Sequence, residues 1–160
     1  MAFAITFIDD WESPVREGVL HILAALQAQP DITVPVGTVN LKLVDDSEIA
    51  ALNEQYTGNA YVTDVLTFNY READSEGTIP GGIPEGELAD IAISQEAATR
   101  QAAEAHISQV EEVAGLALHG LLHVLGYDHQ TAAQRRTLEQ LQSRILGSAG
   151  FSNQEFQWDD

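Results

Sequence analysis

Cysteine is absent from the 160 residues of this chain, and so are long apolar runs. Without cysteine, no disulfide or thiolate metal ligand is available, which fits a cytoplasmic protein. No stretch of 18 apolar residues occurs, so we predict no transmembrane helix and expect no membrane partner. The first ten residues lack a basic segment followed by an apolar block, so no signal peptide is predicted.

Basic residues are scarce as well. Seven Lys and Arg residues face 25 Asp and Glu residues, for a formal net charge of -18. Such a surface repels nucleic acid phosphates at long range, which disfavours a broad RNA-binding face. A bound metal ion with a few local arginines would still form one positive spot on this acidic surface.

Histidine is concentrated in one segment. Three of the five histidines fall within residues 119–129, HGLLHVLGYDH. On a helix, His119 and His123 are separated by ~40° around the axis and ~6 Å along it, so both rings point the same way. Gly126 accepts the left-handed conformation that ends a helix, so the chain can turn and bring His129 back toward them. Three imidazoles with one open position form the usual ligand set of a catalytic zinc.

The segment therefore predicts one metal ion bound by His119, His123 and His129. We favour zinc because imidazole suits it and thiolates are absent, although nickel, copper and iron accept the same ligands. Of the other two histidines, His21 is predicted to lie on a helix without a catalytic role, and His106 on the surface.

Gly120 occupies the position at which many zinc proteases carry a general-base glutamate, in H-E-x-x-H. Peptide hydrolysis by that route is therefore disfavoured. A glycine inside a helix costs ~1 kcal/mol relative to alanine, so it needs a reason. Two reasons are open: close packing of another element against the helix, or space for a bulky substrate beside the metal.

Apolar periodicity predicts an α+β fold, in which a small mixed four-stranded sheet packs with about five helices and the histidine-bearing helix is central. The expected strands span residues 2–9, 37–44, 62–70 and 87–94, and the expected helices span residues 14–28, 45–58, 95–105, 108–125 and 131–146. Residues 71–86 are predicted to form a mobile loop. One domain is expected over residues 1–148, followed by a C-terminal tail over residues 149–160.

Four segments resemble, in order, those of a known family. Residues 119–129 resemble the H-G-x-L-H-L-x-G-Y-D-H signature of the YbeY family, bacterial metal-dependent endoribonucleases of rRNA maturation. Residues 53–56, 63–68 and 88–94 (NEQY, TDVLTF and LADIAIS) are similar to the family's N-x-x-Y, T-D-V-L-S-F and G-D-I-x-I-S segments.

The resemblance implies an α+β fold and a zinc ion bound by the three histidines. It also implies a cleft in which single-stranded RNA is cut, during 16S rRNA 3′-end maturation and ribosome quality control. The implied partners are rRNA and ribosomal components, and no DNA partner is expected.

The chain departs from the family at Thr57, where an arginine thought to engage the phosphate or the transition state usually stands. Arg71 is a candidate substitute for it. Val62 replaces a proline and Ala89 a glycine of the family pattern.

Asp64 and Asp128 are the candidate catalytic residues, as general bases or as partners that orient the histidines. For Asp64 the alternative is a hydrogen bond at the end of a strand, and for Asp128 a turn after Gly126. The sequence leaves open whether water or the RNA's own 2′-OH attacks the phosphodiester.

Two other functions are compatible with the pattern. The histidine spacing alone would suit a zinc metalloprotease-like hydrolase. The acidic charge and the Thr57 departure would suit a non-catalytic, ribosome-associated binding module in which the metal is structural.

Overall fold

The computed structural model describes residues 3–73 and 85–151. They form a four-stranded sheet, five helices of eleven residues or more and one single-turn helix, which confirms the predicted α+β class. The strands are β1 (Phe3–Ile8), β2 (Gly37–Val44), β3 (Val65–Asn69) and β4 (Glu87–Ser94). The helices are α1 (Ser13–Gln27), α2 (Asp46–Thr57), α3 (Tyr70–Ala73), α4 (Gln95–Ala105), α5 (Gln109–Val124) and α6 (Ala132–Ser148).

The sheet is mixed, with strand order β1-β2-β4-β3. β1 pairs with β2 and β2 with β4 in parallel, whereas β3 pairs with β4 in antiparallel orientation. The register places Leu41 beside Ile91 and Val65 beside Ile93, and all four side chains are buried. Alternate residues of the three strands thus present one apolar face to the helices.

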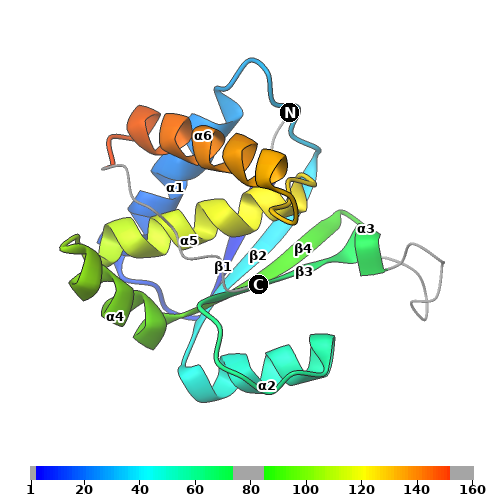
Figure 1. Ribbon diagram of the computed structural model, residues 1–160, viewed down its shortest axis with the longest axis vertical. Helices are drawn as coiled ribbons and strands as arrows, with labels where there is room; N and C mark the ends of the chain where they lie inside the picture. The colour runs from blue at the N-terminus through cyan, green and yellow to red at the C-terminus, as the bar shows by residue number, and fades with distance from the viewer. Residues whose placement is uncertain (1–2, 74–84, 152–160) are drawn as a thin grey trace.

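Helices α1, α5 and α6 lie on one side of the sheet, and α2 lies on the other (Figure 1). Every residue from 112 to 122 of α5 is buried, so this helix is the central element of the core, as its apolar sequence predicted. None of the helices in the described ranges has both the length and the apolar character that a bilayer crossing requires.

Gly120 lies where α5 crosses the sheet. A Cβ placed on it would lie 2.8 Å from Cδ1 and 3.0 Å from Cγ2 of Ile91, and 3.1 Å from Oγ1 of Thr67. Glycine thus allows the helix backbone to approach β3 and β4 closely. Of the two reasons left open by the sequence, close packing is correct, and the expectation of substrate space at this position is wrong.

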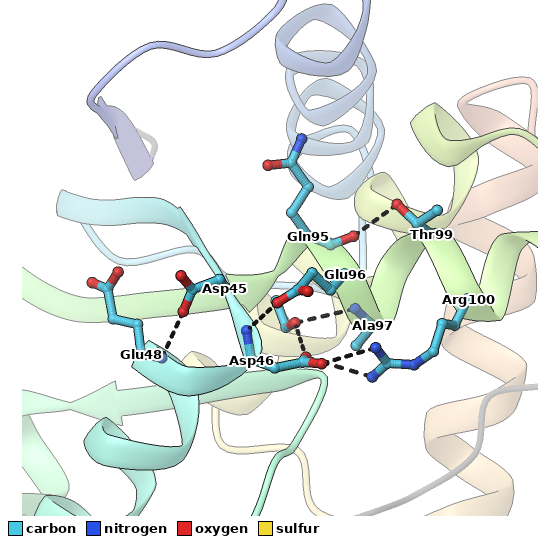
Figure 2. A network of polar contacts seen from close by, with 9 residues as sticks. Asp45, Asp46, Glu48, Gln95, Glu96, Ala97, Thr99 and Arg100 are labelled. Carbon is cyan, nitrogen blue, oxygen red and sulfur yellow. Dashed lines mark hydrogen bonds and ion pairs between the residues drawn. The ribbon is translucent and has the colours of Figure 1, made fainter.

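Polar contacts join the N-terminal ends of α2 and α4 (Figure 2). The backbone N–H of Asp46 donates to Glu96 Oε1 at 2.7 Å, and Ser94 Oγ donates to Asp46 Oδ1 at 2.7 Å. Arg100 Nη1 donates to Asp46 Oδ2 at 2.8 Å, so one aspartate links three elements. The pair with Arg100 holds the pKa of Asp46 below its ordinary value. These contacts fix α2, which supplies one wall of the functional site.

The start of β3 and the segment that follows it differ from the prediction. The strand expected from residue 62 begins only at Val65, because the preceding segment turns before it joins the sheet. Residues 70–73, expected to be strand end and loop, form α3, whose Tyr70 donates from its hydroxyl to Asp90 Oδ2 at 2.8 Å. The rest of the predicted loop, residues 74–84, and the side chain of Arg71 lie outside the described residues.

Helix α6 extends two residues beyond its predicted end, to Ser148. The backbone N–H of Phe151 donates to the Leu146 carbonyl at 2.9 Å, and the Phe151 ring packs against the hydrophobic core. Residues 152–160 of the expected tail lie outside the described residues.

The tight contact at Gly120 predicts that Gly120→Ala destabilises the protein. Overpacking costs about 1–3 kcal/mol and exceeds the ~1 kcal/mol gained in helix propensity, so we expect a net loss of about 1 kcal/mol in urea denaturation. Gly147→Ala in α6 is the control, because its Cβ would meet nothing within 4 Å. An unchanged or increased stability of Gly120→Ala would contradict the packing argument.

Candidate metal centre

His119 and His123 lie on one face of α5, at the end of the helix that passes beneath β3 and β4. Their ring centroids are 4.7 Å apart. His119 is 4% exposed and His123 is partly exposed, so the first ring lies in the core and the second reaches the surface cavity. The helical spacing read from the sequence thus produces the expected pair of adjacent rings.

The helix ends in a Schellman motif centred on Gly126, which has φ 96°. The N–H of Tyr127 donates to the Leu122 carbonyl at 3.0 Å, and the N–H of Gly126 donates to the His123 carbonyl at 3.0 Å. A Cβ on Gly126 would meet nothing within 4 Å, so it is the left-handed conformation that requires glycine here. This motif reverses the chain immediately after the second histidine.

His129 is held between two local motifs. Its backbone N–H donates to Asp128 Oδ1 at 2.7 Å. Two residues later, Thr131 and Gln134 form a capping box at the start of α6. The result is a ring that is 8% exposed, with its centroid 6.0 Å from that of His119 and 5.5 Å from that of His123.

The three predicted ligands therefore converge. One ligand nitrogen from each of His119, His123 and His129 lies within 4.8 Å of the other two. Tetrahedral ligands at ~2.0–2.1 Å from zinc lie ~3.4 Å apart, so small side-chain rotations would close this cluster on an ion. The donor set and geometry fit a metal site. His21 is exposed on α1 and His106 is the C-cap of α4, so neither belongs to the cluster, as expected.

Strand β3 supports the end of α5 from the side. Asn69 Nδ2 donates to the Val124 carbonyl at 3.3 Å, which gives a partner to one of the carbonyls left free at a helix C-terminus. The contact ties the histidine-bearing turn to the sheet.

A cavity of about 400 Å³ opens beside this turn. Its walls come from α2, the segment before β3, β3 itself, α3 and the chain after α5, and they include Asn53, Thr57, Tyr61, Thr63, Val65, Leu66, Thr67, Glu72, His123, Gly126, Tyr127, Asp128 and Gln130. Two carboxylates and no Lys or Arg occur among these described lining residues. Positive charge at this point would come from a metal ion.

Thr57 lines the cavity from the end of α2. Its Oγ1 donates to the Asn53 carbonyl at 2.8 Å and lies 3.0 Å from Asn53 Oδ1. Asn53 in turn donates from Nδ2 to the Tyr61 carbonyl at 3.3 Å. The residue that departs from the family pattern thus closes a helix end and contributes no charge to the cavity.

The two candidate catalytic aspartates lie in different surroundings. Asp128 lines the cavity beside His123, and its Oδ1 makes the turn contact described above. Asp64 is 6% exposed, and its Oδ2 accepts from Gln101 Nε2 at 3.1 Å while its Oδ1 accepts from the Val65 N–H at 2.8 Å. Asp64 thus anchors the start of β3 to α4, and its neighbours Thr63 and Val65 line the cavity.

Three residues near the site were missed by the sequence reasoning. Tyr61 and Glu72 line the cavity, but they belong to segments whose position depends on the tertiary fold. Glu112 lies on the same face of α5 as the histidines and is 4% exposed. Burial, followed by the charge of Asp64, raises the pKa of Glu112 to about 7. Glu112 directly precedes the apolar run that begins at Val113, and this position was a visible sequence signal.

The fold and the site define a class of α+β proteins in which the end of a central helix and the following turn bring three histidines together at a surface cavity. The sequence model described as Endoribonuclease YbeY matches residues 6–150. The chain belongs to the YbeY family of endoribonucleases, hydrolases that act on ester bonds.

Relatives named endoribonuclease YbeY align over most of their length. The protein of Moorella thermoacetica is 45% identical over 143 residues, which cover 86% of this chain and 90% of the relative. That of Geobacillus thermodenitrificans is 35% identical over 155 residues, with 95% and 99% covered. The solution structure of a Thermotoga maritima protein shares the fold, with a TM-score of 0.53 and 22% identity over 97% of this chain and 99% of the other.

The raised pKa of Glu112 predicts that this residue makes stability depend on pH. A buried acid stabilises the fold while it is protonated, so its contribution is complete below its ordinary pKa of 4.5 and is lost as the pH rises to about 7. As the pH rises from 4.5 to about 7, the free energy of unfolding of Glu112→Gln should therefore increase relative to that of the wild type. The expected increase is about 1.4 kcal/mol per pH unit, up to about 3 kcal/mol. Urea denaturation between pH 5 and pH 8 measures this difference.

The control for that series is Glu139→Gln, which removes an exposed charge from α6. A stability difference between Glu112→Gln and the wild type that stays constant with pH would show that Glu112 is ionised throughout.

The converging rings predict that His123→Ala loses metal binding. Substitution of residues that hydrogen-bond to metal ligands typically lowers metal affinity by about 10–100-fold. Loss of a ligand itself should therefore weaken zinc binding by more than about 100-fold. Excess zinc should raise the melting temperature of the wild type and of His21→Ala, but not of His123→Ala. Equal zinc content in all three proteins, by elemental analysis, would refute the site.

Proposed function

We propose that this protein is a zinc-dependent endoribonuclease that cuts single-stranded RNA in 16S rRNA 3′-end maturation and ribosome quality control. Membership of the YbeY family supports the reaction class, and the family resemblance supports the rRNA substrate and ribosomal partners. The observation that carries the proposal is the cluster of three histidines beside a cavity that also contains Asp128.

His119, His123 and His129 would hold the ion, and His123 also lines the cavity. A zinc ion held there supplies Lewis acidity and lowers the pKa of a coordinated water toward ~7. The histidines also position this chemistry, because both the helix and the Schellman turn that carry them are fixed by the sheet. The absence of lysine and arginine from the described cavity lining makes the ion the main source of positive charge for a phosphodiester.

Asp128 is the proposed general base. Its Oδ1 is held by the His129 N–H, and its other oxygen has no hydrogen-bond partner within the described residues. That oxygen can accept a proton from the attacking water or 2′-OH in the cavity. We propose a positioning role for Asp64, since its contacts fix the start of β3 and thereby the cavity wall formed by Thr63 and Val65.

Aromatic side chains favour an unpaired substrate. Tyr61, which is 46% exposed, and Tyr127 both line the cavity. Unstacked bases of single-stranded RNA bind by stacking on such rings, whereas bases within an A-form duplex are already stacked on one another.

The proposal is tested by incubating the zinc-loaded protein with single-stranded RNA, duplex RNA and casein, each with and without a chelator. We expect cleavage of the single strand alone, its loss with chelator and its recovery when zinc is restored. The same treatment of a 16S rRNA precursor with an unprocessed 3′ end should release the mature end. Cleavage of casein but not of RNA would favour the protease-like alternative and overturn the proposal.

The roles of the two aspartates predict different effects on kinetics. Asp128→Asn should lower kcat for RNA cleavage by about 10²–10⁴-fold with little change in KM, because a general base is removed. Asp64→Asn should change kcat far less, and it should lower the free energy of unfolding because its contact with Gln101 is weakened. A larger loss of kcat in Asp64→Asn than in Asp128→Asn would exchange the two assignments.

A further inference from the structure

A second cavity adjoins the histidine cavity. It has a volume of about 300 Å³ and is lined by Asp31, Tyr127, Thr137, Gln140, Leu141 and Arg144. Tyr127 also lines the histidine cavity, so the two cavities share this residue. A strand that occupies the first cavity would therefore pass Tyr127 to reach the second.

The second cavity contains a cation on a strongly acidic protein. Arg144 Nη2 donates to both Asp31 carboxylate oxygens at 2.9 Å, and the side chains of Arg144 and Asp31 are 46% and 58% exposed. An exposed pair of this kind contributes little to stability, so its arginine is available to exchange partners. By contrast, Arg100 and Lys42 pair with residues of α2, away from this cavity.

The other lining groups suit the remaining parts of a nucleotide. Leu141 is 7% exposed and supplies apolar surface to the cavity, and Tyr127 supplies an aromatic side chain, the kind on which a base stacks. Thr137 and Gln140 carry groups that can donate to, or accept from, a ribose or a base edge. Arginine is the side chain best matched to a phosphate.

We propose that this second cavity is a nucleotide subsite for single-stranded RNA, in which Tyr127 stacks on a base and Arg144 binds a phosphate in place of Asp31. The inference rests on the proposed function, because it assigns to the second cavity a nucleotide beyond the two that the scissile bond joins. Asp31 then competes with the phosphate for Arg144 and restrains binding. Specificity for an extended strand follows, because a dinucleotide has no third nucleotide to place in the second cavity.

The test measures binding of a fluorescein-labelled 2′-O-methyl hexauridylate to the zinc-loaded full-length chain, by anisotropy over a range of salt concentrations. Gel electrophoresis verifies that the probe stays intact. Arg144→Ala should bind about 10-fold more weakly, and the slope of log affinity against log salt should fall in magnitude by about 0.7, the value for one phosphate contact. Asp31→Asn should bind the probe up to about 5-fold more tightly, because the side chain that competes with the phosphate for Arg144 loses its charge.

Arg16→Ala is the charge-matched control, because Arg16 lies over the Phe7 ring and lines neither cavity. It should leave the salt slope unchanged, and melting curves should show that all three variants are folded. Equal salt slopes for Arg144→Ala and Arg16→Ala, or weaker binding by Asp31→Asn, would overturn the subsite.

Cleavage of unmodified RNA separates this proposal from the proposed function. If the wild type cuts RNA and the subsite is real, Arg144→Ala should raise KM for a hexanucleotide and leave kcat and the cleavage of a dinucleotide unchanged. If the wild type cuts RNA while Arg144→Ala behaves like Arg16→Ala, the subsite is wrong and the function stands. If no RNA is cut but binding responds as described, the function fails and the nucleotide site stands.

Discussion

The close approach of α5 to the sheet at Gly120 is the contact on which the site depends. A side chain at this position would push the helix away from Ile91 and Thr67. The same helix carries His119 on one side of this contact and His123 on the other, so its depth in the core sets the depth of both rings. His119 is therefore buried in the core, whereas His123 lies nearer the surface and lines the cavity. The stability of the core and the geometry of the histidine cluster are therefore two results of the same packing.

Two local motifs after α5 place His129 beside the two histidines of the helix. The Schellman turn at Gly126 and the capping box at Thr131 begin and end the short segment that returns His129 to the helix. Both motifs are formed by hydrogen bonds between near neighbours in sequence. The other cavity walls come from the end of α2, from β3 and from α3, which are distant from the histidine turn in sequence and lie beside it in the folded protein.

The site is acidic, in keeping with the whole chain. Its described lining carries Glu72 and Asp128 but no basic side chain, and Thr57 contributes only hydrogen bonds. Under the proposed function, neutralisation of a phosphodiester would fall to an ion between the histidines, and further attraction to the strand would fall to cations outside the cavity such as Arg144. An acidic protein of this kind would bind RNA at a few defined points, and its selectivity would come from stacking and from the fit of the strand.

The convergence of His119, His123 and His129 followed from the sequence alone, because helical spacing and the conformational freedom of Gly126 are local properties. The strands, the five long helices and the central position of α5 also followed from periodicity. The sequence did not distinguish packing from substrate space at Gly120. It also did not show that Asp128 lines the cavity or that Asp64 is buried at the start of β3. It also missed Tyr61, Glu72 and Glu112. These points were decided by tertiary structure, because each depends on which distant segment of the chain packs against the residue. The spacing of side chains along the sequence does not encode such contacts.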